Sequence, residues 1–262
     1  MYSWTQVVLI VFSLLLTSVA RSEEVQANRP FKVAYAESWA PISSGQGESV
    51  QGILPSIIDE VVSRRMGIEV VHQGFPWARA QEMVRSGGVD AFITTPTMER
   101  MVFSSASREV VFTLRFQPVV RAGSEEERLL RSEEDLTRHL ASRRYCDVLG
   151  NGWAAQFYKD KALAYVVVPT IDICLKHLAE GKTDIVVHAT PVVQSFISQL
   201  DLTEQIVILP LVMSSSPDFP LLLSKESSFD KEFLEKFDET LAEIKALGIW
   251  EVLVNPGAVS SN

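Results

Sequence analysis

Residues 87–100 read GGVDAFITTPTMER, and this stretch contains the features that decide the fold. Its two glycines follow a helix-like segment and tolerate the positive φ that often ends a helix. After an aspartate, the short apolar run 91–93 is typical of a strand covered on both faces. Threonines and one arginine, Arg100, follow. Because ligands of open α/β sheets bind beyond the carboxyl ends of the strands, the stretch predicts one wall of a small-molecule site.

The same pattern recurs in residues 178–191, which read LAEGKTDIVVHATP. Gly181 and Asp184 keep the spacing of Gly87 and Asp90, and an apolar strand again follows a helix-like segment and a turn. Two copies are too few for a solenoid. They predict two α/β lobes of similar topology that face each other across a cleft. The alternative is chance, since helix–glycine–strand turns are frequent in α/β proteins.

The composition is that of a globular protein, with 262 residues of which 47% are hydrophobic and 22% are charged. A net charge of -9 without a Lys/Arg-rich run argues against nucleic acid and against an anionic membrane surface as partners. The four histidines are scattered, and the sequence has no HExxH, Walker or GxSxG motif. We therefore expect neither a metal site nor a cofactor.

Residues 7–20 (VVLIVFSLLLTSVA) form an uncharged apolar run that is short for a membrane span. The run ends in small residues and is followed by polar sequence, as at a signal-peptidase site. We expect residues 1–20 to be a cleaved secretory signal and the mature protein to be periplasmic. An uncleaved anchor is the alternative, because no Lys or Arg precedes the run.

The two cysteines, Cys146 and Cys174, both fall in the second predicted lobe. Export would permit a disulfide between them. Two buried thiols, which pack as small hydrophobic groups, fit equally well, because the pairing cannot be deduced from sequence.

Two long apolar extended runs predict where the chain passes between the lobes. The first, VVFTLRFQPVV, exceeds the length of most strands, and the second reads IVILPLV. We expect crossovers at 118–123 and 206–212. This division gives a discontinuous first lobe, residues 29–118 and 210–255, and a continuous second lobe, residues 123–206.

Several side chains near predicted strand ends are candidates for ligand contacts. The planar guanidinium of Arg100 suits a carboxylate. Trp39 follows the first strand and offers a stacking face, or packs on its own lobe. The turn 150–152 feeds a helix and presents backbone N–H groups to an anion, or is a plain strand–helix turn. Arg79 lies in the first turn of a helix, where the dipole disfavours a cation, although a solvated arginine is the simpler interpretation.

The order and spacing of these features resemble the bacterial extracellular solute-binding proteins of family 3, the amino-acid-binding components of ABC importers. The resemblance covers residues 30–254. It implies a type II periplasmic-binding-protein fold, with two α/β lobes joined by a two-stranded hinge. The residues that carry it are Trp39-Ala40-Pro41, Gly52, Gly88-Val89-Asp90-Ala91, Thr97-Met98-Glu99-Arg100, Gly181-Lys182-Thr183-Asp184 and the closing helix 229–250.

The resemblance implies a monomeric binding protein, not an enzyme, that captures a small carboxylate-bearing metabolite for an ABC permease. It implies that Arg100 grips the carboxylate, that Trp39 covers the ligand, and that the turn at Asn151 and Gly152 binds from the other lobe. Further candidates are the polar and aromatic side chains near these positions, namely Glu37, Trp77, Arg79, Thr94, Thr95, Trp153 and His188.

One position departs from the family pattern. Members that bind α-amino acids usually carry an acid five residues after the aspartate that matches Asp184, and Ala189 occupies that position here. An α-ammonium group would lack this partner, at a cost in free energy, unless Glu37 replaces it. A carboxylate ligand is therefore better supported than an amino acid.

Two other functions stay open at this point. A few proteins of this fold dehydrate cyclic acids such as prephenate or arogenate, and Glu37, Glu99 and His188 are the candidate acid–base groups. A ligand-binding sensor or accessory protein is the second alternative, because the sequence does not separate sensing from transport.

Overall fold

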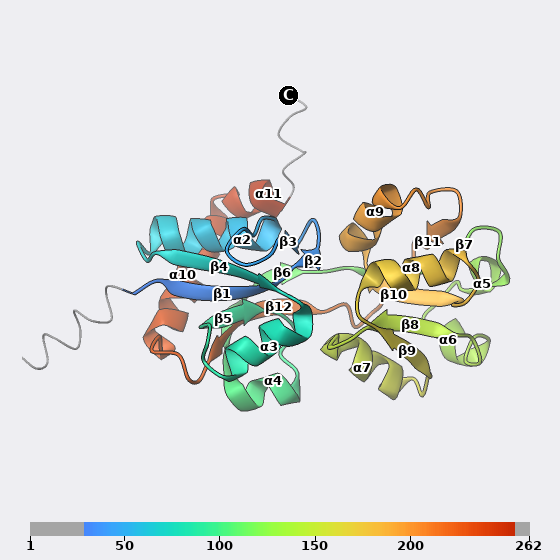
Figure 1. The fold of residues 1–262 in the computed structure, drawn as a ribbon, viewed down its shortest axis with the longest axis horizontal. Helices are drawn as coiled ribbons and strands as arrows, with labels where there is room; N and C mark the ends of the chain where they lie inside the picture. The colour runs from blue at the N-terminus through green and yellow to red at the C-terminus, as the bar shows by residue number, and fades with distance from the viewer. Residues whose placement is uncertain (1–28, 255–262) are drawn as a thin grey trace, which may run out of the picture.

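The computed structural model describes residues 29–254, which form two α/β lobes, each built on one five-stranded sheet (Figure 1). The first sheet contains β1 (Phe31–Ala36), β4 (Val70–Phe75), β5 (Ala91–Ile93), β6 (Ser104–Thr113) and β12 (Asp218–Ser224). Its strand order is β4-β1-β5-β12-β6. β4, β1 and β5 are parallel, and β12 is antiparallel to both β5 and β6.

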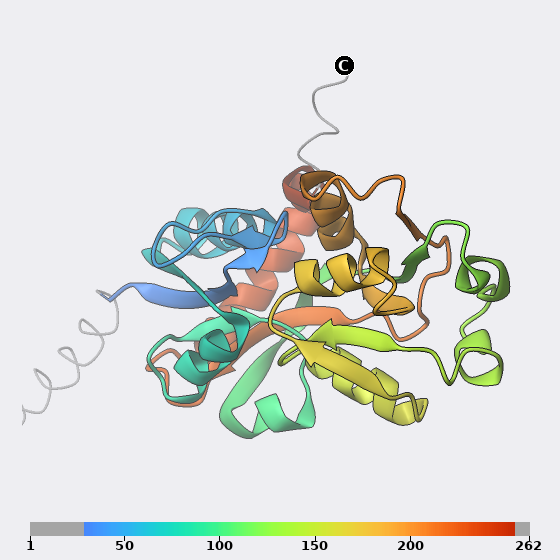
Figure 2. The same ribbon diagram turned by 45° about the vertical axis from the view of Figure 1, so that its right-hand side comes forward.

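The second sheet repeats this design. It contains β7 (Phe116–Arg121), β8 (Tyr145–Val148), β9 (Tyr165–Val168), β10 (Ile185–Ala189) and β11 (Ile206–Ile208), in the order β11-β7-β10-β8-β9. β8, β9 and β10 are parallel, and β7 is antiparallel to both β10 and β11. The two lobes remain side by side when the molecule is turned (Figure 2). The predicted two-lobe α/β fold is thus confirmed.

Helices cover both faces of each sheet, so the central strands are buried on both sides. In the first lobe, one face carries α2 (Ile53–Ile58), η1 (Asp59–Arg65), α10 (Lys231–Ala246) and α11 (Ile249–Val254), and the other carries α3 (Trp77–Arg85) and α4 (Met98–Phe103) (Figure 1). The second lobe carries α5 (Glu125–Leu129), α6 (Asp135–Arg138), α7 (Gly152–Asp160), α8 (Ile171–Ala179) and α9 (Thr190–Gln199). A short hairpin, β2 (Ser38–Trp39) and β3 (Ser43–Ser44), follows β1.

The repeated glycine–aspartate turns have the same structural role in both lobes. Asp90 accepts the backbone N–H of Lys32 at 2.9 Å and pairs with Arg29 at 2.6 Å. Asp184 accepts the backbone N–H of Arg144 at 2.9 Å and pairs with the guanidinium of the same residue at 2.6 Å. Both aspartates lie just before a strand and bind the chain that enters the neighbouring parallel strand. They therefore fix strand register at the edge of the sheet opposite the carboxyl ends.

The chain passes between the sheets at 114–115 and at 209–217, so both passages differ in their bounds from the predicted crossovers 118–123 and 206–212. β7, which includes most of the expected crossover 118–123, pairs with β10 and β11 and belongs to the second sheet. Likewise, β11 occupies the start of the expected crossover 206–212. The apolar run 110–120 contains parts of β6 and β7, which belong to different sheets. Its hydrophobic pattern continues through the point where the chain changes sheet.

The two passages run side by side, as Figure 1 also shows. The backbone N–H of Leu114 donates to Pro217 at 3.2 Å, and that of Met213 donates to Phe116 at 2.9 Å. These hydrogen bonds join the two connecting segments into one two-stranded link between the lobes.

The question of the cysteines is settled by a disulfide between Cys146 of β8 and Cys174 of α8. The proposed signal segment, residues 1–20, lies outside the described residues. Within residues 29–254, no helix is long and apolar enough to cross a membrane.

We expect Asp90→Asn to lower the free energy of unfolding by about 1–3 kcal/mol, because Arg29 and the Lys32 N–H lose a buried carboxylate partner. Urea denaturation followed by circular dichroism measures this change. Glu99→Gln removes an exposed ion pair with Arg85 and should cost less than about 1 kcal/mol. Equal losses in the two variants would contradict the structural role of Asp90.

Candidate functional site

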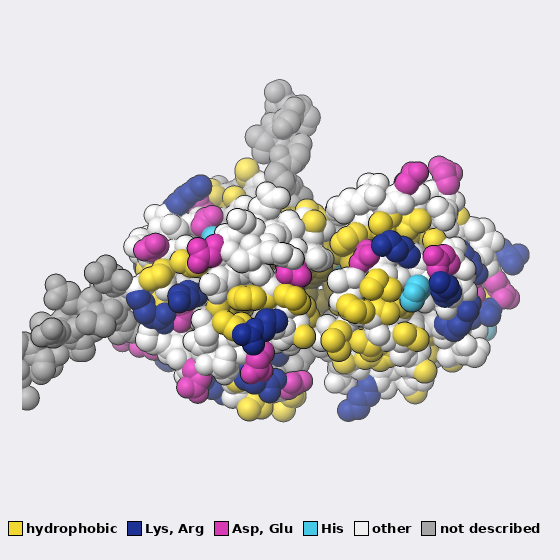
Figure 3. All heavy atoms as spheres, in the orientation of Figure 1, with side chains coloured by type: hydrophobic (Ala, Val, Ile, Leu, Met, Phe, Trp, Pro, Cys, Tyr) yellow, Lys and Arg dark blue, Asp and Glu magenta, His cyan; other side chains and the backbone are white. Residues whose placement is uncertain are grey.

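A cavity of about 310 Å³ lies between the lobes, at the carboxyl ends of the parallel strands. Space-filling spheres show hydrophobic side chains on both sides of the hollow between the lobes (Figure 3). Eight of the eleven side chains proposed from the sequence line the cavity, namely Glu37, Trp39, Trp77, Thr94, Thr95, Arg100, Asn151 and His188. The structure thus brings together groups from five separate parts of the chain.

Arg100 is positioned by the first turn of α4 and by the end of β5. Thr97 caps the helix, since its hydroxyl accepts the Arg100 N–H at 3.4 Å. The guanidinium turns back toward the strand end, where Nη1 donates to Thr94 Oγ1 at 3.0 Å and to the Thr95 carbonyl at 2.9 Å. The threonines after β5 therefore hold the arginine in the cavity wall.

The same guanidinium reaches the second lobe. Its Nη2 donates to the carbonyl oxygen of Gly150 at 2.9 Å, and the indole N–H of Trp77 donates to that oxygen at 2.9 Å. Its Nε donates to Gln81 Oε1 at 3.1 Å. One backbone carbonyl of the second lobe thus accepts hydrogen bonds from two side chains of the first lobe that line the cavity.

Arg100 is a buried cation without an acidic partner. Its exposed fraction is 3%, and burial lowers its pKa to about 10, so it stays protonated at neutral pH. The carboxylate of Glu99 opposes this shift, but Glu99 itself is exposed and pairs with Arg85. Among the described residues, no carboxylate forms an ion pair with Arg100. A buried cation of this kind suits an anionic partner.

His188, at the end of β10, is buried on the opposite wall and packs 5.6 Å from the ring of Phe116. Burial lowers the pKa of His188 to about 4, so the imidazole is neutral above this pH. The backbone of Ala189 acts in the opposite direction and raises the pKa of His188, but by less than burial lowers it. Within the described chain, Nδ1 has no hydrogen-bond partner. The imidazole therefore meets the cavity as a neutral, largely buried ring.

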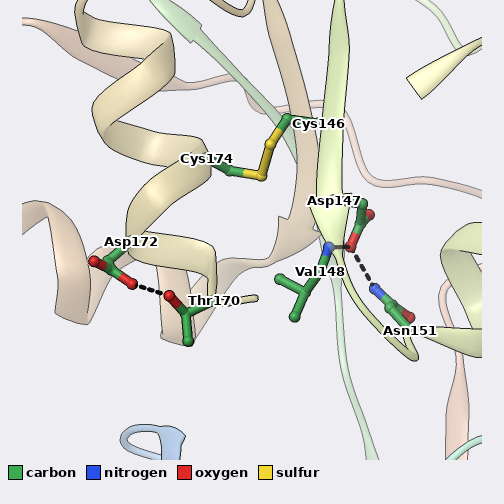
Figure 4. Close-up of a disulfide and its surroundings, with 7 residues drawn as sticks. All are labelled: Cys146, Asp147, Val148, Asn151, Thr170, Asp172 and Cys174. Atoms are coloured by element: carbon green, nitrogen blue, oxygen red, sulfur yellow. Dashed lines mark hydrogen bonds between the residues drawn. A yellow bond between two sulfur atoms is a disulfide. The ribbon is translucent and has the colours of Figure 1, made fainter. Parts of the chain in front are cut away.

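Asp147 lies behind the turn that presents Gly150. Its Oδ1 accepts the backbone N–H of Val148 at 2.6 Å and the amide of Asn151 at 2.9 Å (Figure 4), while Oδ2 has no partner in the described chain. Asn151 in turn caps α7. Burial raises the pKa of Asp147 to about 7, more than its two hydrogen bonds lower it. This carboxyl group therefore fixes the turn and remains partly protonated near neutral pH.

Three proposed residues do not line the cavity. Arg79 is exposed, and Trp153 is buried in the second lobe, where it stacks on Phe157 and donates to the Ser215 carbonyl. Gly152 contacts the site from behind, because a Cβ there would lie 2.7 Å from Thr97 Cγ2. The prediction that Arg79 and Trp153 share the site is therefore wrong: one side chain points to solvent and the other fills the core.

Several cavity residues were not proposed from the sequence. Phe116 and Phe219 come from the first residues of β7 and from β12, next to the link between the lobes, and Thr170 and Ile171 begin α8. The phenylalanines lie in apolar strand runs, which give no signal that one side chain faces a cavity. Within residues 29–254, no group of His, Cys, Asp and Glu side chains forms an arrangement suited to a metal ion.

The sequence of residues 31–256 matches the model of a protein family described as bacterial extracellular solute-binding proteins, family 3. Comparison with curated proteins gave no match. Among solved structures, a variant of ArgBP from T. maritima shares 20% identity and covers 89% of this chain and 97% of its own, with a TM-score of 0.71.

Two further solved structures have the same fold. The substrate-binding protein AbpA from Streptococcus pneumoniae, bound to L-arginine, shares 18% identity over 89% of this chain and 96% of its own, with a TM-score of 0.71. The GluR0 ligand-binding core from Nostoc punctiforme, in complex with glutamate, shares 19% identity over 87% and 98%, with a TM-score of 0.69. At these identities the likeness establishes the fold, and the ligands belong to those proteins.

We expect Asp147→Asn to stabilise the protein at pH 8 by on the order of 2–4 kcal/mol and to have little effect near pH 4. The folded pKa of Asp147 lies above its unfolded value, so the folded state holds more protons between about pH 4 and 7, and wild-type stability falls as the pH rises through this window. Asparagine retains the acceptor for Val148 and Asn151 but carries no charge.

Urea denaturation at both pH values measures the difference. Asp160→Asn, at an exposed position of α7, is the matched control and should change stability by less than about 0.5 kcal/mol at either pH. The interpretation fails if Asp147→Asn is less stable than the wild type at pH 8.

Proposed function

Because the chain belongs to the bacterial extracellular solute-binding proteins of family 3, we propose that it captures a small carboxylate-bearing metabolite between its two lobes. The observation that carries this proposal is Arg100, a buried guanidinium that lines the interlobe cavity and has only uncharged partners. A buried cation without a counter-charge is costly, and an anionic ligand removes that cost.

A carboxylate is the anion that best fits the group. Four of the five guanidinium N–H donors bind Gln81, Thr94, Thr95 and Gly150, and the remaining Nη2 donor is left for a carboxylate oxygen of the ligand. Thr94 and Thr95 hold Nη1 in place before any ligand arrives. Because little side-chain freedom is then lost on binding, most of the charge-assisted interaction contributes to affinity.

Closure of the lobes is proposed to complete the site. In the present arrangement, the Gly150 carbonyl accepts hydrogen bonds from Arg100 and Trp77, and Gly152 lies against Thr97 and Arg100. These contacts exist only when the lobes are together. A ligand that binds Arg100 and the second lobe at once favours this closed arrangement over an open one.

The proposal extends to delivery. We infer that the exported, monomeric protein hands its ligand to an ABC permease in the inner membrane, as the importer components of this family do. Binding rather than catalysis is supported by the position of the acid–base candidates. Glu99 lies outside the cavity and pairs with Arg85. Glu37 and His188 both line the cavity, but no hydrogen bond joins them within the described chain, so neither of these two activates the other.

We expect Arg100→Gln to weaken binding by about 2–4 kcal/mol, or roughly 30- to 1000-fold, because the charge-assisted contact is lost. Isothermal titration calorimetry against a panel of small carboxylates identifies a ligand for the wild type and then measures the loss in the variant. Arg79→Gln removes an arginine outside the cavity and should leave affinity unchanged. Unchanged affinity in Arg100→Gln, or no ligand in the panel, would contradict the proposal.

We expect Gly152→Ala to lower affinity for the same compound by about 1–3 kcal/mol, because the added methyl group keeps the lobes apart. Gly152 has no positive φ, so alanine introduces no backbone strain and the lobes themselves should fold as before. Gln156→Ala, at an exposed position of the same helix, is the control. Wild-type affinity in Gly152→Ala would show that binding does not require this close approach.

A further inference from the structure

The walls of the interlobe cavity carry one charge of each sign. Among the described residues that line it, Arg100 is the only Lys or Arg side chain and Glu37 is the only Asp or Glu side chain. His188 also lines the cavity, but burial lowers its pKa to about 4, which keeps the imidazole neutral near pH 7. Asp147 lies behind the turn that presents Gly150 and does not line the cavity. The walls are therefore balanced in charge.

Glu37 is fixed by its backbone at the carboxyl end of β1. Its N–H donates to the Phe75 carbonyl at 2.9 Å, and its own carbonyl accepts the N–H of Gly45 at 3.0 Å. The residue is partly buried, and its carboxylate forms no hydrogen bond or ion pair within residues 29–254. The carboxylate is therefore available to a cationic group of the ligand.

Both charged side chains belong to the first lobe. Glu37 follows β1 and Arg100 lies in α4, whereas the lining residues of the second lobe are uncharged. In the described chain these two side chains do not form an ion pair with each other. A ligand with one carboxylate and one cation can therefore pair with both on the first lobe, and the second lobe then closes over it with neutral groups.

A ligand that the lobes enclose removes water from both charged side chains. A carboxylate that loses its hydration without gaining a cation is costly, so a ligand whose only charge is a carboxylate leaves Glu37 uncompensated. A dicarboxylate adds a second anion to a cavity that already contains one, and like charges repel each other. A ligand with two cations finds one acidic side chain for both. The lowest cost thus falls to a zwitterion with one charge of each sign.

The rest of the cavity wall is mainly apolar. Trp39 and Trp77 from the first lobe and Phe116 and Phe219 from the segments beside the link line a space of about 310 Å³. Trp39 packs edge-on against Phe219, with 5.8 Å between the ring centroids. A space of this size with aromatic walls suits a branched alkyl group or a single ring attached to the charged end of the ligand.

We infer that Glu37 determines the charge class of the ligand by pairing with its cationic group, so that the protein selects a zwitterionic monocarboxylate with an apolar body. The inference rests on the proposed function, because it requires that Arg100 bind the carboxylate. It goes further by assigning to Glu37 the discrimination against simple carboxylates, dicarboxylates and dibasic compounds.

Calorimetry with two matched pairs of compounds tests the inference on the wild-type protein. Phenylalanine is compared with 3-phenylpropanoate, and leucine with 4-methylpentanoate, so each pair differs only in the ammonium group. Arginine adds a second cation, and glutamate adds a second anion. We expect at least one of phenylalanine and leucine to bind, and to bind at least about tenfold more tightly than its partner without the ammonium group, than arginine and than glutamate.

Equal or tighter binding of a compound without the ammonium group, of arginine or of glutamate overturns the inference. The proposed function stands in that case, because each of these compounds carries a carboxylate. The inference is also overturned if neither phenylalanine nor leucine binds, and the wider carboxylate panel then decides separately whether the proposed function fails as well.

Two variants give a second test that does not depend on the absolute affinity. Glu37→Gln keeps the size of the side chain and removes its charge, so it should lower the affinity ratio of the amino acid to its partner without the ammonium group at least about tenfold. Glu48→Gln, at an exposed position of the loop after β3, should keep the wild-type ratio. A merely structural role of Glu37 would weaken both compounds alike, so an unchanged ratio in Glu37→Gln contradicts the inference.

Discussion

The structure depends on one buried cation. Arg100 lies in the wall between the lobes with an exposed fraction of 3%, and each of its hydrogen bonds goes to an uncharged oxygen. Burial lowers its pKa to about 10 without removing its charge at neutral pH. The first lobe holds the guanidinium rigidly through Thr94 and Thr95, and the second lobe contacts it through Gly150. A single group thereby links anion recognition to the approach of the two lobes.

The two lobes share the same glycine–aspartate turn between a helix and a strand. In each, a helix ends at a glycine, and an aspartate then binds the chain entering the neighbouring strand. Asp90 and Asp184 stand at the edge of the sheets remote from the cavity, so they stabilise the scaffold and leave the opposite edge free. The carboxyl ends of the parallel strands then supply the cavity walls, as is general for open α/β sheets.

Much of this was predictable from the sequence, for physical reasons that can be named. The repeated turns indicated two lobes because a glycine with positive φ and a following aspartate leave a strong local signal. Arg100 and the threonines before it could be placed at a strand end. The crossover could not be located, because β6 and β7 are both apolar extended runs, and the change of sheet between Thr113 and Phe116 alters neither composition nor periodicity.

Several aromatic side chains were harder to place. Trp153 is as aromatic as Trp77, but its ring stacks on Phe157 inside the lobe. Phe116 and Phe219 look like core residues and face the cavity because they flank the link between the lobes. Such cases are decided by tertiary packing, which a local pattern does not record.

A ligand-bound crystal structure of the protein, purified without removal of any co-purifying small molecule, tests the central claim most directly. The account predicts a carboxylate in the interlobe cavity, with one oxygen about 3 Å from Nη2 of Arg100. A ligand bound elsewhere, or one in this cavity that leaves the Arg100 guanidinium without an anionic contact, would contradict it.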